Sequence, residues 1–398
     1  MATTSSEAPS KPLHLIPWAN AENRRDGHSI WLMLKSIVFF GAIFFSGAVG
    51  WLVYMSWQPF VLLLSPKLFR VYGDRLGSWW AQIPAFLCNY IYGINLVVTG
   101  DPLDKNDKAS IFISNHTTLF DWLFLWDFFL RQQRLLYEKI VLKGSLKSLP
   151  FFGWSMQAMK FIFVARNKGV DLPHLRDMLN SFAIEKTPIQ LLLFPEGTIN
   201  DDVGLLSSAN YAAKAGLPFR RHSLYPREGA LVVAIQSLRN NGFTSLYDIT
   251  LGYPDVIPRG QFFSGHAPRE VYVHVKRYSA EEIPNGSEEI KEWLVKLWEE
   301  KNKNLVRFYE ERLTFDTSTS IPHSVPVRKL FKHQLQQIIA AITFYLPLFL
   351  FVIATVQYWS TPIMVSIILL TLSAIFITYF GGLERTELWR NGYLKPRD

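Results

Sequence analysis

The chain has 398 residues, enough for one large domain or two of ordinary size. It is 49% hydrophobic and 15% aromatic, and its net charge of +8 favours anionic partners such as nucleic acid, an acidic membrane surface or a phosphorylated substrate. The single cysteine excludes an intrachain disulfide and a zinc cluster built from cysteines. Because the sequence has no arginine-rich helix or other nucleic-acid-binding pattern, the hydrophobicity favours a membrane as the partner.

The first hydrophobic region follows a polar segment, residues 1–28, which lacks the apolar core of a cleaved signal peptide. No charged residue occurs from 36 to 66, a stretch long enough to cross a hydrocarbon core of about 30 Å. Gly47, Gly50 and Pro59 interrupt this stretch, so a bent or re-entrant hairpin is the alternative to a single crossing. We therefore expect membrane-embedded or interfacial helices over residues 29–100.

Strand-like and helix-like patterns alternate through the middle of the chain, residues 101–315. The expected strands are residues 110–114, 161–164, 189–194, 249–252 and 270–278, and the expected helices are residues 173–185, 207–215 and 287–313. The strand at 189–194 (IQLLLF) is apolar almost throughout, as an interior parallel strand should be. The sequence therefore predicts a layered α/β domain with a mostly parallel central sheet, flanked by membrane-embedded helices at both ends.

The second hydrophobic region, residues 334–383, contains no charged residue. A single helix of that length would be about 75 Å long, far more than a bilayer needs. The turn-like sequence QYWSTP divides it, so we expect two transmembrane helices near residues 338–356 and 363–380. A linker and a basic polar tail are expected on either side, at residues 316–333 and 384–398.

A histidine and an aspartate lie close together in SNHTTLFDW, residues 114–122. We expect a helix to begin near Thr117 or Thr118, and residues five apart on one helix point about 140° away from each other. His116 and Asp121 can therefore meet only if the histidine lies in the turn before the helix. Asp121 would then fix the tautomer of the imidazole and leave its other nitrogen as a general base. A capping histidine beside a partly solvated aspartate is the alternative interpretation.

A second motif, LLLFPEGT at residues 191–198, is an apolar strand stopped by a turn. The strand should bring Glu196 to the same edge of the sheet as His116, where its carboxylate would hold a loop or a substrate hydroxyl. Gly197 can adopt positive φ and lets the backbone approach a ligand closely, and Thr198 follows it. The alternative is a strand-ending turn with a surface glutamate.

Two basic residues complete the candidate site. Arg166 follows an expected strand and would reach the same edge of the sheet, where a guanidinium can clamp a phosphate. Lys214 lies near the end of an expected helix. The alternatives are a surface arginine closing a strand and a solvated lysine that suits the helix dipole. Since the sequence has no nucleophile elbow, P-loop or zinc-protease motif, we expect a base acting on a hydroxyl of the substrate rather than covalent catalysis.

These motifs resemble those of the glycerophospholipid acyltransferases. NHTTLFD resembles their N-H-x-x-x-x-D signature, and FIFVAR, FPEGT and the Tyr225–Pro226 region resemble their second, third and fourth blocks, in the same order. The segments DWLFLWDFF, KIVLKGSLKSLPFFGWSMQ and DITLGYPDVIP are similar to the eukaryotic branch of lysocardiolipin and lysophosphatidylinositol acyltransferases, with the 1-acylglycerol-3-phosphate (lysophosphatidic acid) acyltransferases as close relatives. The sequence differs from that pattern at Thr117, where this branch often has arginine.

The resemblance implies a layered acyltransferase domain that transfers a fatty acyl group from acyl-CoA, as co-substrate, to a lysophospholipid hydroxyl, without a metal or other cofactor. His116 would deprotonate the acceptor hydroxyl and Asp121 would orient His116. The residues expected to bind the acceptor's glycerophosphate region or another anionic group are Arg166, Glu196, Gly197, Thr198 and Lys214.

Three questions stay open at this point. The acceptor is a lysophosphatidylinositol, a lysocardiolipin or a lysophosphatidic acid. The alternative function is a catalytically inactive lipid-binding membrane protein that keeps the fold. The expected location is the endoplasmic reticulum membrane, with several crossings, and a mitochondria-associated membrane is the alternative.

Overall fold

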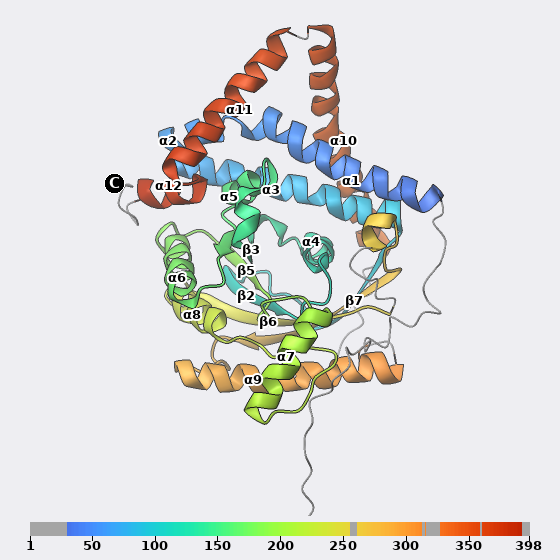
Figure 1. Ribbon diagram of the computed structural model, residues 1–398, viewed down its shortest axis with the longest axis vertical. Helices are drawn as coiled ribbons and strands as arrows, with labels where there is room; N and C mark the ends of the chain where they lie inside the picture. Colours follow the sequence, from blue (N-terminus) through green and yellow to red (C-terminus); the bar gives the residue numbers. More distant parts are fainter. Residues whose placement is uncertain (1–29, 255–260, 313–314, 316–326, 359, 392–398) are drawn as a thin grey trace, which may run out of the picture.

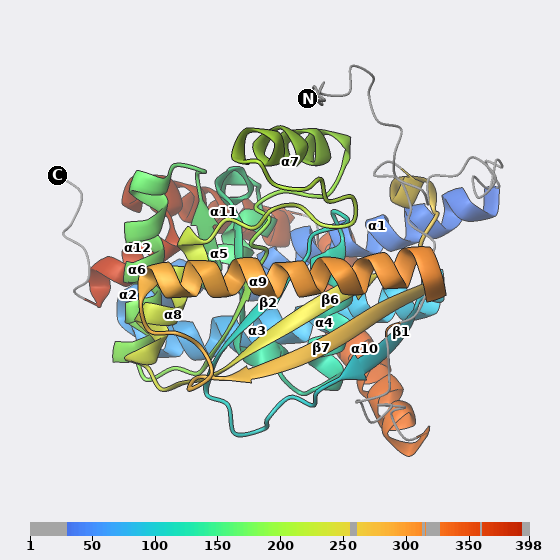
Figure 2. The same ribbon diagram turned by 90° about the horizontal axis from the view of Figure 1, so that it is seen from below.

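The computed structural model describes residues 30–254, 261–312, 315, 327–358 and 360–391 (Figure 1). A central sheet lies between one long helix and a layer of N-terminal helices, and a helical hairpin near the C-terminus rises away from that layer (Figure 1). Figure 2, seen from below, shows the long helix α9 (Ser287–Val306) crossing the sheet, with the N-terminal helices behind. The expected polar segment 1–28 and most of the expected linker lie outside the described residues.

The sheet has seven strands in the order β1-β7-β6-β2-β5-β3-β4. Every neighbouring pair is parallel except β6 and β7, which confirms the mostly parallel sheet. The strands are β1 (Asn95–Gly100), β2 (Ala109–Ser114), β3 (Glu138–Lys143), β4 (Ile162–Val164), β5 (Ile189–Leu193), β6 (Phe243–Gly252) and β7 (Glu270–Ser279). Since β6, β2 and β5 are parallel neighbours, the residues that follow them meet at one edge of the sheet.

Apolar side chains cover both faces of the sheet. Ile111 and Ile113 of β2 point to one face and belong to the core formed with α6, α8 and α9. Phe112, between them, points to the other face and belongs to the core formed with the N-terminal helices and α4. This double burial explains why β2 and β5 are fully buried and read as continuous apolar runs.

The helices of the globular part are α4 (Asp121–Arg131), α5 (Phe152–Ala158), α6 (Lys168–Ile184), α7 (Asp202–Ala215), α8 (Gly229–Arg239) and α9. Short 3₁₀ segments cover Leu135–Tyr137, Gly144–Ser148 and Gln261–Ser264, and π-helical turns cover Trp51–Met55, Cys88–Tyr92 and Arg307–Arg312. The last of these turns, η8, continues from the end of α9, so the helix expected over 287–313 is regular only to Val306.

Several elements differ from the expectation: β6, α6 and α7 begin five or six residues earlier, and α5 and α8 were not expected. Three further differences concern β1, β3 and the start of α4. β1 lies inside the region 29–100, which was expected to be helical throughout, and it pairs with β7. β3 was missed because it begins with two charged residues, Glu138 and Lys139, both of which are buried. The helix after His116 begins at Asp121 rather than near Thr117, because the turn before it donates its backbone N–H groups to the Asp121 carboxylate.

The N-terminal helices are α1 (Ile30–Gly50), α2 (Gln58–Leu64) and α3 (Pro66–Leu87), and the C-terminal ones are α10 (Val327–Gln357), α11 (Ser360–Phe380) and α12 (Leu383–Arg390). By length and composition, the segments Ile30–Leu64 and His333–Gln357 are long and apolar enough to cross a membrane, whereas the apolar part of α11, Ile363–Ile375, is shorter. α1 and α3 lie side by side along the globular part, and α10 and α11 form the hairpin above them (Figure 1).

The segment expected to be a polar tail, 384–398, instead begins with a packed helix. Two glutamates of α12 are each 1% exposed in their side chains. The Glu387 carboxylate accepts from Arg70 Nε at 3.0 Å and from Arg70 Nη2 at 2.5 Å. The Glu384 carboxylate pairs with Lys147 Nζ at 2.9 Å and with His174 Nε2 at 2.6 Å. α12 therefore joins the end of the hairpin to α3 and to the globular part.

Glu387→Gln should destabilise the protein by about 3–5 kcal/mol, because it leaves the buried Arg70 guanidinium without its bidentate partner. The thermal unfolding midpoint of the detergent-solubilised protein measures the change. The control is Glu288→Gln, which removes an exposed pair with Lys291 and should leave the midpoint unchanged. Equal midpoints for the two variants would contradict the structural importance of the Arg70–Glu387 pair.

Candidate active site

His116 lies in the turn between β2 and α4 and contacts Asp121 directly. Its Nδ1 is 2.8 Å from Asp121 Oδ2, and the imidazole stacks on the Phe194 ring at a centroid distance of 4.4 Å. The His116 side chain is 19% exposed and that of Asp121 is 0% exposed. Nε2 has no hydrogen-bond partner among the residues that the structure describes. With Nδ1–H donating to Asp121, Nε2 carries a lone pair that can accept a proton.

The Asp121 carboxylate is surrounded by donors. Oδ2 accepts from the backbone N–H of Thr117 at 2.6 Å, in addition to His116. Oδ1 accepts from Thr118 Oγ1 at 3.0 Å and from the Tyr253 hydroxyl at 2.5 Å. Asp121 also opens α4, where the helix dipole favours a negative charge. These contacts hold the carboxylate in one orientation toward His116.

Asn115 links the histidine turn to the neighbouring strand β6 by side-chain hydrogen bonds. It is 1% exposed, its Oδ1 accepts from the backbone N–H of Leu251 at 2.8 Å, and its Nδ2 donates to the Leu251 carbonyl at 3.0 Å. The second N–H of the amide donates to Thr117 Oγ1 at 3.1 Å, so both amide donors have partners. The position of His116 is therefore fixed from β6 as well as from α4.

Glu196 reaches the same edge, as the sequence predicts, but it is used by the protein backbone. Its Oε2 accepts from the backbone N–H of His116 and its Oε1 from that of Leu224, each at 3.2 Å. The residue is only 2% exposed. Of the two interpretations given above, the geometry favours the one in which Glu196 holds loops, and a substrate hydroxyl has no access to it.

Two arginines flank Gly197 at the surface of this edge. Arg166 Nη2 donates to the Gly197 carbonyl at 3.3 Å, and the exposed side chain of Arg227 also lies against Gly197, where an added Cβ would be 3.3 Å from Arg227 Cδ. Gly197 has φ +69°, a conformation that glycine adopts without strain. Thr198 follows and is partly buried.

Lys214, in contrast, is exposed in the last turn of α7, and in the described part of the chain it contacts none of the other site residues.

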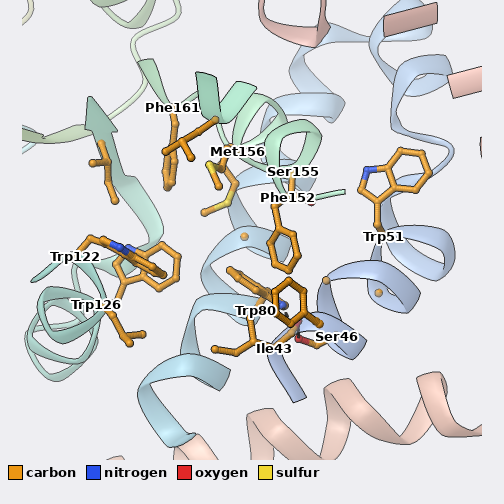
Figure 3. Close-up of a pocket in the computed structure, with 18 of the residues that line it drawn as sticks. Ile43, Ser46, Trp51, Trp80, Trp122, Trp126, Phe152, Ser155, Met156 and Phe161 are labelled. Atoms are coloured by element: carbon orange, nitrogen blue, oxygen red, sulfur yellow. Dashed lines mark hydrogen bonds between the residues drawn. The ribbon is translucent and has the colours of Figure 1, made fainter. Parts of the chain in front are cut away.

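An apolar cavity of about 410 Å³ lies next to the end of the histidine turn (Figure 3). It lies between the N-terminal helices, α4, β3 and α5, and Figure 3 shows Trp51, Trp80, Phe152 and Met156 around it. Its lining includes Leu119 and Phe120, the third and fourth residues after His116. A volume of this size with an apolar lining fits a hydrocarbon chain.

The sequence interpretation missed three residues of this site: Asn115, Arg227 and Tyr253. Asn115 could have been found from the sequence, because it is a polar residue directly after a buried-strand pattern and directly before His116. Tyr253 and Arg227 lie 132 and 111 positions along the chain from Asp121 and His116, so only the fold brings them into the site. No group of three or more histidine, cysteine or acidic side chains in the described part of the chain is arranged to hold a metal ion.

Comparisons with known proteins give consistent similarities. The model of the family described as Acyltransferase matches residues 95–253, and that described as Acyltransferase C-terminus matches residues 261–344. Lysocardiolipin acyltransferase 1 of Gallus gallus is 38% identical over 287 residues, which cover 71% of this chain and 75% of the relative. The Mus musculus protein of that name is 33% identical over 368 residues, covering 90% and 93%.

More distant similarities follow. Lysophosphatidylinositol acyltransferase 10 of Caenorhabditis elegans is 32% identical over 280 residues, covering 69% of this chain and 71% of the relative. Among solved structures, the crystal structure of the 1-acyl-sn-glycerophosphate (LPA) acyltransferase PlsC from Thermotoga maritima matches with a TM-score of 0.46 at 15% identity. It covers 69% of this chain and 97% of that one.

The buried Glu196 should make stability depend on pH. Burial raises its pKa to about 8, although the N–H groups of His116 and Leu224 and the charge of Lys301 oppose the shift. Because the folded state holds this proton more tightly than the unfolded chain, the stabilisation is complete below about pH 4.5 and is lost as the pH rises toward 8.

Glu196→Gln removes this proton and should flatten the pH dependence of the free energy of unfolding by up to about 1.4 kcal/mol per pH unit between those values. Denaturant unfolding at a series of pH values measures it. The exposed Glu299→Gln serves as control and should keep the wild-type slope. If Glu196→Gln also keeps that slope, Glu196 does not hold a proton in the folded state.

Proposed function

We propose that this chain, which belongs to the Acyltransferase family and is a lysophospholipid acyltransferase, uses acyl-CoA as its acyl donor. The fatty acyl group is transferred to the free hydroxyl of an anionic lysophospholipid. The observation that carries the proposal is the position of His116 Nε2. It is an unpartnered base in the described structure, in a turn whose Leu119 and Phe120 line the apolar cavity. The backbone N–H of His116 donates to Glu196, the residue before the Gly197 that both arginines contact.

His116 and Asp121 act as a general-base pair. Nε2 takes the proton of the acceptor hydroxyl as the hydroxyl oxygen attacks the thioester carbonyl carbon. The tetrahedral intermediate then collapses, the carbon–sulfur bond breaks, and the imidazolium returns the proton to the thiolate of CoA. Asp121 stabilises the imidazolium and holds Nδ1–H in place throughout. A positioned base of this kind contributes about 10²–10⁴-fold to the rate.

The cavity supplies a site for a fatty acyl chain. Because its walls are aromatic and aliphatic side chains, it favours a hydrocarbon over a polar headgroup. A chain that enters it from the side of Leu119 and Phe120 would leave its carboxyl end close to the turn that carries His116. The thioester of a chain bound in this way would lie beside the imidazole of His116.

The arginines supply a site for the acceptor's phosphate. Arg166 and Arg227 are both exposed and meet at Gly197, so their guanidinium groups can bind a phosphate from two sides. The open backbone at Gly197 and the neighbouring Thr198 would contact the glycerol, and Lys214 would add positive charge farther out. Lysophosphatidylinositol, lysocardiolipin and lysophosphatidic acid all carry a glycerophosphate beside the free hydroxyl, so each fits this site.

Membrane attachment follows from the helices. Both candidate spans, Ile30–Leu64 and His333–Gln357, keep many apolar side chains exposed on the protein surface. In our proposal α10 and α11 cross the bilayer, α1 to α3 lie near the headgroup layer, and the basic site faces the cytoplasmic side. The proposed location is the endoplasmic reticulum membrane.

The test uses membranes that contain equal amounts of the wild type, His116→Ala or a control, His174→Ala. Each receives labelled oleoyl-CoA and one of four acceptors: lysophosphatidylinositol, monolysocardiolipin, lysophosphatidic acid or lysophosphatidylglycerol. We expect product from the wild type, a loss of at least about 100-fold in His116→Ala, and near wild-type activity in the control. The control removes another histidine–carboxylate pair, that with Glu384, away from the site.

Product from wild type that persists in His116→Ala would contradict the base. No product from any acceptor would favour the alternative, a lipid-binding membrane protein that keeps the fold without activity.

A further inference from the structure

The Tyr253 hydroxyl donates a hydrogen bond of 2.5 Å to Asp121 Oδ1, on the side of the carboxylate away from His116. The two carboxylate oxygens are thus divided between different partners. Oδ2 faces His116 Nδ1 and the Thr117 N–H, and Oδ1 faces the hydroxyls of Tyr253 and Thr118. We propose that Tyr253 is a positioning residue of the acyl transfer, which holds Asp121 so that Oδ2 faces His116; the inference rests on the function proposed above.

The fold holds Tyr253 firmly in this position. It is the first residue after β6, is 1% exposed, and packs its ring against Phe124 of α4 at a centroid distance of 5.9 Å. Its backbone N–H donates to the Tyr309 hydroxyl at 3.2 Å. Because β6 lies next to β2, the carboxyl end of one strand carries the tyrosine and that of the other carries the histidine turn.

A second tyrosine–aspartate pair on the same strand gives a reference for a purely structural bond. The buried Tyr247 hydroxyl donates to Asp107 Oδ2, just before β2 begins and therefore at the opposite end of that strand from His116. The two pairs share residue types, burial and strands. They differ in that only Asp121 contacts a histidine.

The electrostatic consequence falls on His116. With Oδ1 held by the hydroxyl, Oδ2 stays directed at Nδ1 and stabilises the imidazolium that forms when His116 takes a proton. Without the hydroxyl the carboxylate can turn away from Nδ1, so the imidazolium loses part of this stabilisation. Burial and the negative charge of Asp121 raise the pKa of Tyr253 well above its usual value, so the hydroxyl keeps its proton over the working pH range.

Other titratable groups face the pair from the elements packed around it. They are Glu196 in the loop after β5, Lys301 of α9 and Tyr309 of η8. Arg166, after β4, contacts Gly197 next to Glu196. Of these, Glu196 contacts the backbone of His116 and Tyr309 contacts the backbone of Tyr253. Among the side chains described, Tyr253 and Thr118 are the hydroxyls recorded as donors to the Asp121 carboxylate.

The experiment compares Tyr253→Phe with Tyr247→Phe. Phenylalanine keeps the ring packing and removes only the hydroxyl in both. We measure kcat and KM for oleoyl-CoA and the accepted lysophospholipid, and kcat/KM as a function of pH. The reaction of His116 with diethyl pyrocarbonate, followed by peptide mass spectrometry at each pH, gives the pKa of the imidazole without any turnover.

Tyr253→Phe should lower kcat by about tenfold to 100-fold, the effect of one charge-assisted hydrogen bond, with both KM values within about twofold. The acid limb of the pH profile and the midpoint of His116 labelling should both move to lower pH by about half a unit or more. Tyr247→Phe should lower the thermal midpoint while leaving kcat, the pH profile and the labelling pKa unchanged.

If Tyr253→Phe behaves like Tyr247→Phe, or if its loss of activity comes with an unchanged labelling pKa, Tyr253 is structural and the inference is wrong. A wild type without His116-dependent transfer would overturn the proposed function instead. The labelling pKa would still decide whether Tyr253 acts on the pair.

Discussion

The Asp121 carboxylate is the point on which the site depends. It is fully buried at the start of α4, and it is tolerated there because a histidine, a tyrosine, a threonine and two backbone N–H groups all donate to it. All but one of these donors come from the turn after β2, and the Tyr253 hydroxyl comes from the end of β6. The carboxylate therefore has its full set of donors only when β2 and β6 are paired.

Buried charges that are satisfied by partners from distant parts of the chain also occur between the N-terminal helices and the sheet, where they stabilise the fold. Arg70 of α3, Asp74 of α3, Lys139 of β3 and Glu387 of α12 form a buried set of charges in which each has an opposite partner. Because buried charges are costly unless paired, the arrangement specifies how the helical layer sits on the sheet. The apolar cavity lies within this layer, so its walls are fixed relative to His116 by charges outside it.

The amino-acid sequence predicted features that depend on neighbouring residues, and it missed those that depend on contacts between residues far apart in the chain. β2 and β5 are mostly apolar, and His116 and Asp121 are five residues apart, so pattern and spacing placed the histidine in a turn from which it could reach the aspartate. β3 was missed because its first residues, Glu138 and Lys139, look like surface charges. Lys139 is in fact neutralised by Asp74, 65 residues earlier in the chain.

The role of Glu196 could be predicted only in part. Its place at the sheet edge followed from the strand before it, while its use by the backbone of His116 and Leu224 depends on a loop whose path the sequence does not reveal. The burial of α12 could not be predicted for the same reason. Its glutamates suggest an exposed helix, but in the fold they are buried because they pair with Arg70 and Lys147.

The central claim is that His116 works where the apolar cavity meets the basic edge of the sheet. A structure of His116→Ala with bound oleoyl-CoA tests it most directly, because the variant should hold the donor without consuming it. The account predicts the acyl chain inside the cavity among Trp80, Phe152 and Met156, with the thioester at the position that the imidazole has vacated. A chain bound along the outer face of α1, with the thioester remote from Asp121, would contradict it.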